Sequence, residues 1–274
     1  MKYCIDFRKN FKYINEVDEI TIEYNRKDTS LLDFLLLYKD KRINIYIKDA
    51  KDFLENNDLD RFIAISKDYP DLNYYLKLRD PARDEDSFCL YEKIREKTGI
   101  LYFFDTFVSD WDTLWGYIQM LPLDIYVTEN LCFELDKVSS ILHEYGIKVR
   151  TFPNVCQTKW NKTPSLKTFF IRPEDVDMYE KYIDTLEFFG KADSIETMYK
   201  IYAIDKKWFG PLKELIIGFK SDMDSRFIIP RFAEKRIRCG KKCLKGGTCD
   251  VCSKIEQLSK VLEENKLLVQ IDKE

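Results

Sequence analysis

Short apolar runs alternate along the chain with longer stretches in which apolar residues recur every three or four positions. Residues 100–105 form a continuous apolar run that ends in aspartate, which is typical of a strand buried on both faces. Helices predicted at 109–121 and 132–144, bounded by a serine N-cap, a proline and a glycine C-cap, separate this run from strands at 123–127 and 147–152. A strand–helix–strand series with short loops predicts parallel strands.

The same unit extends in both directions along the chain. Five further strands are predicted, at 19–24, 43–48, 73–78, 167–171 and 185–189. The helices predicted beside them are 29–40, 49–68, 84–97, 173–182 and one that begins at Ser194. Eight strand–helix units predict an α/β fold of the (β/α)8 TIM-barrel class over residues 1–230. An open doubly wound sheet is the alternative, but it normally carries a glycine-rich phosphate-binding turn, which this sequence lacks.

The remaining residues, 231–274, form a cysteine-rich extension that ends in a predicted helix after Ser253. Half of the eight cysteines lie within fourteen residues, at Cys239, Cys243, Cys249 and Cys252. Four thiolates so close together can bind one metal centre, because soft sulfur ligands select zinc or iron–sulfur clusters. Zinc ribbons usually have two C-x2-C pairs and this loop has one, so the spacing favours a [4Fe–4S] cluster, with zinc as the alternative.

The residues around these cysteines are basic. Between 231 and 245 one glutamate stands against seven basic residues, Arg231, Lys235, Arg236, Arg238, Lys241, Lys242 and Lys245. Positive neighbours favour the thiolate form of cysteine, and they offset the charge of about −2 that four thiolates leave on zinc or on an oxidised cluster. The 231–245 segment is also a candidate docking surface for RNA or for a protein or peptide substrate.

Composition limits the other possibilities. The 274 residues are 45% hydrophobic and carry a net charge of −3, which does not indicate a polycation that binds nucleic acid with its whole surface. We expect no signal peptide, because no long apolar region follows Met1, and no membrane span, because no run of about 18 apolar residues occurs. These features predict a cytoplasmic protein with free cysteines, and they disfavour disulfides as the explanation of the cysteine loop.

In this fold class the active site lies at the carboxyl ends of the strands. The candidate catalytic residues, at or just past predicted strand ends, are Glu23, Lys48, Arg79, Asp105, Glu129 and Arg172. The alternative for each is an ordinary charged residue that faces solvent. His143 is the only histidine and lies near a helix end, where its charge complements the helix dipole, so a Ser-His-Asp or Cys-His triad is disfavoured.

Residues 170–176 (FIRPEDV), 182–188 and 129–154 resemble the peptidase U32 (collagenase-like) group. The resemblance implies a barrel with a carboxyl-terminal cysteine set. It also implies either peptidase activity or iron–sulfur-dependent hydroxylation of RNA bases or of a quinone precursor. The chain departs from the group at two points: Thr128-Glu129 stands in place of an Arg-Glu pair, and the His-Gly pair before the cysteine is absent, with Pro153-Asn154 nearby.

Two classes of function follow from the sequence. The first is an enzyme that modifies a macromolecule, with a metal cluster in the extension and the basic segment as its docking surface. The second is a non-catalytic binding or regulatory protein, in which the four cysteines hold a structural zinc ion. Iron and acid-labile sulfide in the purified protein would favour the first, and stoichiometric zinc without sulfide the second.

Overall fold

The computed structural model describes most of the chain. The described residues are 1–7, 11–82, 84–97, 99–105, 107–108, 111–127, 134–154, 170–188, 190, 192–219, 222–229, 232–239 and 250–266. Within these residues, no helix is long and apolar enough to cross a lipid bilayer.

One parallel sheet forms the centre of the molecule. Its strands are β1 (Lys2–Asp6), β2 (Glu19–Glu23), β3 (Arg42–Ile47), β4 (Tyr74–Arg79), β5 (Tyr102–Asp105), β6 (Phe107–Val108), β7 (Asp124–Val127), β8 (Lys148–Thr151) and β9 (Thr185–Phe188). The sheet runs in the order β5-β4-β3-β2-β1-β9-β8-β7-β6. One residue separates β5, which pairs with β4, from β6, which pairs with β7. The two edges of the sheet are therefore adjacent along the chain, and the parallel strands form a nearly closed barrel of eight strand positions, as the sequence predicts.

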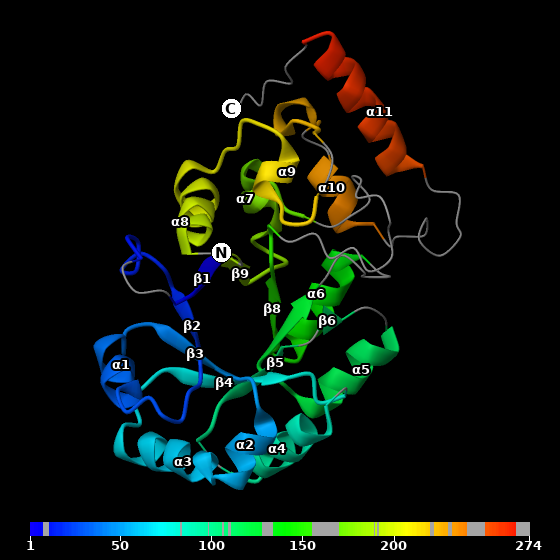
Figure 1. The fold of residues 1–274 in the computed structure, drawn as a ribbon. Helices are drawn as coiled ribbons and strands as arrows, with labels where there is room; N and C mark the ends of the chain where they lie inside the picture. The colour runs from blue at the N-terminus through cyan, green and yellow to red at the C-terminus, as the bar shows by residue number, and fades with distance from the viewer. Residues whose placement is uncertain are drawn as a thin grey trace.

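Helices follow most strands and lie outside the barrel (Figure 1). They are α1 (Leu31–Leu37), α2 (Ala50–Glu55), α3 (Asp58–Asp68), α4 (Glu85–Arg95), α5 (Trp111–Met120), α6 (Leu135–Glu144), α7 (Val176–Tyr179) and α8 (Ala192–Tyr199). The π-helix η2 (Lys200–Asp205) continues α8. The link from β1 to β2 differs, because its described part consists of turns. The alternation of strand and helix confirms the predicted (β/α)8 class.

The strand predicted at 167–171 is wrong in its described part, and the amino-terminal β1 takes its place in the barrel. Phe170 and Ile171 are buried, but their backbone is not in a strand, and the Ile171 N–H donates to the carbonyl of Pro153 at 3.2 Å. Burial explains the apolar pattern there without β pairing. β1 instead lies between β2 and β9, with Cys4 in register with Glu19 and with Glu187.

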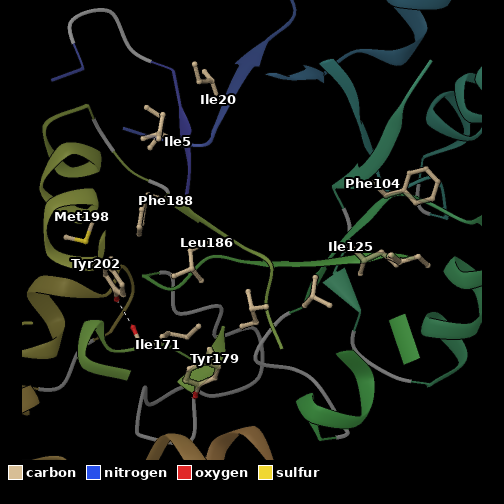
Figure 2. Packing of buried hydrophobic residues seen from close by; sticks show 14 of the residues in the cluster. Ile5, Ile20, Phe104, Ile125, Ile171, Tyr179, Leu186, Phe188, Met198 and Tyr202 are labelled. Carbon is tan, nitrogen blue, oxygen red and sulfur yellow. Dashed lines mark hydrogen bonds between the residues drawn. The ribbon is translucent and has the colours of Figure 1, made fainter. Parts of the chain in front are cut away.

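The hydrophobic core lies outside the barrel, between strands and helices. Figure 2 shows Ile5, Ile20, Phe104, Ile125 and Leu186, which come from five strands and belong to one core of buried residues. The same core continues beyond β9, where the hydroxyl of Tyr202 donates to the carbonyl of Ile171 at 2.7 Å. Successive side chains of a strand point to opposite faces of the sheet. Because these core residues point outward, the residues next to them in each strand point into the barrel.

The chain after η2, which includes the 231–274 segment and is called the carboxyl-terminal extension from here on, packs at the end of β8. It contains α9 (Leu212–Leu215), the 3-10 helix η3 (Ser225–Phe227), α10 (Phe232–Ile237) and α11 (Val251–Glu264). The Ile217 N–H donates to the carbonyl of Asn154, three residues past β8, at 2.8 Å, and Phe170 contacts the ring of Phe219. In Figure 1, α9 and α10 lie with α7 on the side of the strands opposite α2, α3 and α4. The extension thus shares the barrel's core and is anchored at the carboxyl end of the barrel.

Helix α11 begins earlier than the sequence predicts. Its N-cap is Asp250 rather than Ser253, so Cys252 lies in its first turn. Ile255 is buried, as expected for a helix that docks, but Leu258 and Val261 are about half exposed. The helix therefore contacts the rest of the molecule along a narrower face than its apolar pattern predicts.

Candidate active site at the barrel mouth

The inside of the barrel holds buried ions, and the guanidinium of Arg150 lies at their centre. Arg150 is fully buried on β8. Its Nη1 lies 2.7 Å from Glu19 Oε2 and 2.9 Å from Asp124 Oδ2, and its Nη2 lies 3.4 Å from Glu187 Oε2. Three strands, β2, β7 and β9, supply these carboxylates. Because an unpaired buried charge is costly, each of these ions depends on the others.

The part of this network nearest the amino ends of the strands, here called the lower layer, contains Glu19, Asp124 and Arg42. Arg42 is the first residue of β3 and binds both carboxylate oxygens of Asp124, with Nη1–Oδ1 and Nη2–Oδ2 distances of 3.1 and 2.7 Å. Its guanidinium carbon also lies 3.7 Å from the ring centroid of Tyr75. Asn44 bridges the layer, since it accepts a hydrogen bond from Arg42 and donates one to Glu19. Strand-starting residues thus close the amino end of the barrel.

The part of the network nearer the carboxyl ends of the strands, here called the upper layer, contains Lys77 and Glu187. The Nζ atom of Lys77, on β4, lies 3.1 Å from Glu187 Oε1 and 3.7 Å from Asp105 Oδ1. Thr21 and Tyr126 also donate hydrogen bonds to the Glu187 carboxylate. Asp105 is the last residue of β5, at the carboxyl end of the barrel, where barrel enzymes bind their substrates.

The electrostatics of the upper layer hold two of its groups ionised. Burial would lower the pKa of Lys77, but Glu187, Tyr126 and Asp105 together outweigh burial, so the pKa lies well above its usual value. Burial would raise the pKa of Glu187, but Lys77 and Arg150 lower it further than burial raises it. Lys77 is consequently an ammonium at neutral pH, unlike the neutral amine that a Schiff-base lysine requires.

Asp105 behaves differently. Burial raises the pKa of its carboxyl group, the neighbouring Glu187 raises it further, and Lys77 only partly offsets them. Its side chain is 27% exposed, compared with 5% for Glu187. A carboxyl group with a raised pKa at an accessible strand end is the type of group that serves as a general acid or base.

Aromatic rings surround the Lys77 ammonium. Its Nζ lies 4.8 Å from the ring centroid of Tyr126, and the rings of Tyr46, Phe103 and Phe152 are within about 6 Å. Phe152 stacks on Tyr126 with a centroid distance of 5.1 Å and is only partly buried. These rings hold Lys77 in place by cation–π contacts and give the mouth a flat apolar wall.

Two of the predicted catalytic residues, Glu23 and Lys48, contact each other. The Nζ of Lys48 lies 3.3 Å from Glu23 Oε1, and both side chains are more than half exposed. They line a cleft of about 520 Å³ at the ends of β2 and β3, together with Asp49 and Asp52. A second cleft of about 590 Å³ is lined by Glu23 and Asp6, from the ends of β2 and β1.

The other four predicted residues, Arg79, Asp105, Glu129 and Arg172, do not share one location. Arg79, the strand neighbour of Asp105, hydrogen-bonds Tyr46, which raises the pKa of its guanidinium, and its side chain is exposed. Asp105 joins Lys77 as described above. Glu129 lies outside the described residues. Four of the six, Glu23, Lys48, Arg79 and Asp105, therefore lie at the carboxyl ends of adjacent strands from β2 to β5.

Arg172 has a structural role. It was a candidate because it follows the predicted strand at 167–171, and its described neighbours Phe170 and Ile171 are not in a strand. Its guanidinium is buried and forms a bidentate ion pair with Asp175, at 2.6 and 2.8 Å. It also donates to the carbonyl of Ile228 at 3.0 Å. Arg172 thus fastens the extension to the barrel.

Two of the four loop cysteines can be placed. Cys239 follows α10 and is half-buried, and Cys252 is buried in the first turn of α11. Cys243 and Cys249 lie outside the described residues. Among the described residues alone, no group of three or more His, Cys, Asp or Glu side chains is arranged to hold a metal ion.

Sequence reasoning missed Lys77, which lies inside a strand rather than at its end. The signal that could have found it is the polar side of the strands, where residues 75, 77 and 79, or 19, 21 and 23, alternate with apolar ones. In a barrel this side faces inward, so charges on several strands must meet there.

No family model matches the chain. No curated protein matches it either.

Proposed function

We propose that the protein is an enzyme whose reaction takes place at the carboxyl end of the barrel. The observation that carries this proposal is the accessible Asp105 carboxyl group beside the buried Lys77 ammonium. An acid–base group with a raised pKa next to a fixed positive charge can move a proton and stabilise the negative charge that results. Such a pair, at the end of the barrel where ligands bind, favours catalysis over a purely structural role.

The proposal includes one metal centre held by Cys239, Cys243, Cys249 and Cys252, a [4Fe–4S] cluster or alternatively zinc. Four thiols are the donor set that either centre requires. The two described cysteines support it, because one follows α10 and the other lies in the first turn of α11, so they flank the other two in the chain. A cluster would supply electron transfer, whereas zinc would supply only stability. The thiols would need a reducing compartment such as the cytoplasm.

The proposed substrate is a macromolecule, either RNA or a protein, as expected for a U32-like enzyme that hydroxylates RNA or cleaves peptides. The basic 231–245 segment is the proposed docking surface. The described basic residues of this segment differ in exposure. Lys235 and Arg238 are exposed, whereas Arg236 is buried with its guanidinium near the ring of Phe232. Arg236 therefore stabilises the extension and is excluded from the docking surface.

The alternative is a binding or regulatory protein without catalysis, in which zinc fastens the tail. One observation favours it: the extension shares the core of the barrel through Phe170, Phe219 and Phe232. A metal ion that stabilises this packing would need no reaction at the mouth.

Metal analysis of anaerobically purified protein separates the two proposals. The enzyme proposal predicts iron and acid-labile sulfide in stoichiometric amounts and a visible absorption that reduction changes. Cys249→Ser should lose both, and Cys89→Ser should keep them, because Cys89 is an exposed cysteine on α4, outside the loop. Stoichiometric zinc without sulfide would support the alternative. Protein without bound metal would contradict the metal centre in both proposals.

A further inference from the structure

The charges inside the barrel do not balance. The described network contains four carboxylates, Glu19, Asp105, Asp124 and Glu187, and three cations, Arg42, Lys77 and Arg150. Arg79 is in register with Asp105, but its side chain is exposed and hydrogen-bonds Tyr46, so it is not part of this buried network. Three cations can neutralise three carboxylates, so one negative charge is in excess among the described residues. Because an excess charge in a buried site is costly, one carboxylate should take up a proton more readily than the others.

Geometry identifies that carboxylate as Asp105. Arg150 lies within 3 Å of Glu19 and Asp124, and Lys77 lies 3.1 Å from Glu187. The distance from Lys77 to Asp105 is longer, 3.7 Å. Asp105 is also the most exposed of the four carboxylates, so a proton or a ligand can reach it from the mouth.

The groups that face Asp105 keep their protonation states, so none of them can replace Asp105 as the group that gains and loses a proton. They are Lys77 and Arg79 from β4, Tyr126 from β7, Arg150 from β8 and Glu187 from β9. Glu187 holds Lys77 as an ammonium, and an arginine stays protonated in proteins. Tyr126 donates its hydroxyl proton to Glu187, which is itself held ionised by two cations.

We propose that Asp105 is the catalytic acid–base residue of the mouth and that Lys77 is the positioning residue that fixes its charge. This inference rests on the proposed function, because it assumes chemistry at this end of the barrel. The Asp105 carboxylate removes a proton from an O–H, N–H or C–H group of the ligand. That bond breaks, an O–H bond forms on Asp105, and the electron pair stays on the ligand, where the Lys77 ammonium stabilises it. The reverse transfer restores both groups.

The substrate class follows from this arrangement. The ligand must carry a proton whose loss leaves an anion, and the anion must lie beside Asp105, whose Oδ1 is 3.7 Å from the Lys77 Nζ. An oxygen anion, formed from a hydroxyl group or from the position next to a carbonyl group, satisfies both conditions. The partly buried ring of Phe152 would border the flat side of such a ligand.

The test is a pH titration of the folded, unmodified protein, followed by NMR of the aspartate carboxyl carbons. Asp105→Asn identifies the signal by its loss. We expect the Asp105 midpoint to lie above the ordinary aspartate value of 3.8. Lys77→Gln should move it higher, because the ammonium favours the carboxylate. Glu23→Gln, which removes an exposed carboxylate at the same end of the barrel, should leave it unchanged.

An Asp105 midpoint at or below 3.8 in the unmodified protein would overturn the inference, whether or not Lys77→Gln folds. An unchanged midpoint in a folded Lys77→Gln protein would overturn the role of Lys77. These failures differ from a failure of the proposed function, which depends on metal analysis. A protein with a cluster and an ordinary Asp105 would refute this inference alone, and a metal-free protein with a raised Asp105 midpoint would refute the metal centre alone.

Discussion

Arg150 shows how one side chain can organise the interior of a barrel. Its guanidinium contacts carboxylates from three strands and is fully buried. Well-packed apolar residues can replace such a network without loss of stability, but removal of one partner leaves uncompensated charges in a low dielectric. The network therefore makes the barrel sensitive to single substitutions at positions where ordinary barrels carry Val, Ile or Leu.

Arg150→Met should lower the free energy of unfolding by about 3–5 kcal/mol, because it leaves Glu19 without its closest cation. Urea denaturation followed by circular dichroism measures this. Lys48→Met is the matched control, since it removes a cation from an exposed pair with Glu23 and should cost less than about 1 kcal/mol. Equal losses in the two variants would contradict the network.

The network should also make stability depend on pH. Burial alone would raise the pKa of Glu19, but Arg150 and Arg42 lower it to about 2 from 4.5. A depressed pKa means that the folded state holds the carboxylate more strongly than the unfolded chain does. Its stabilisation is complete above pH 4.5 and is lost as the pH falls towards about 2.

Glu19→Gln should therefore be less stable than the natural protein at neutral pH, and the difference should shrink through this acid range. Denaturation curves at a series of pH values measure it. Glu23→Gln serves as the control, because the Glu23 side chain is 58% exposed. A difference between the Glu19→Gln and natural proteins that is constant with pH would show that Glu19 does not gain from ionisation in the fold.

At the scale of elements, the first strand closes the barrel. Ile5 on β1 is fully buried in the core between β2 and β9. Ile5→Ala should destabilise the protein by about 2–5 kcal/mol, the usual cost of such a cavity. Leu37→Ala, on an α1 side chain that is 70% exposed, should change stability by less than about 0.5 kcal/mol. If Ile5→Ala were as mild as Leu37→Ala, residues 1–6 would not be part of the barrel.

The extension depends on Arg172. It connects η1 (Pro173–Asp175), through Asp175, to the carbonyl groups of residues 225 and 228. Arg172→Met should destabilise this junction and speed proteolysis of the extension, because Asp175 loses its buried partner. Arg226→Met is the control, since Arg226 is a partly exposed neighbour paired with Asp224. Limited proteolysis with mass spectrometry compares the two, and equal cleavage rates would refute the anchoring role.

The sequence predicted the fold class because buried strands and amphipathic helices leave periodic patterns. The prediction of individual strands failed at two places. Phe170 and Ile171 are buried without being in a strand, and the sequence of β1 was not recognised as a strand. For the site, strand ends pointed to Asp105, but its partner Lys77 lies mid-strand. The contacts between β4 and β9 depend on barrel closure, which local patterns do not encode.

At the scale of the whole molecule, the chemistry gathers at the carboxyl end of the barrel. Asp105 lies at the end of β5, and the extension that carries Cys239 and Cys252 is anchored just past β8 through Asn154. The ion network closes the amino end, so a ligand reaches Asp105 from the carboxyl end. We therefore expect the proposed metal centre and the acid–base group to lie on the same side of the molecule.

The most direct test of this account is anomalous X-ray scattering from crystals of anaerobically purified protein. The account predicts a signal at the iron absorption edge, bonded to the Sγ atoms of Cys239, Cys243, Cys249 and Cys252 and located at the carboxyl end of the barrel. A signal only at the zinc edge would favour the structural alternative. Four sulfur atoms too far apart to share one centre, with no metal signal between them, would contradict the account.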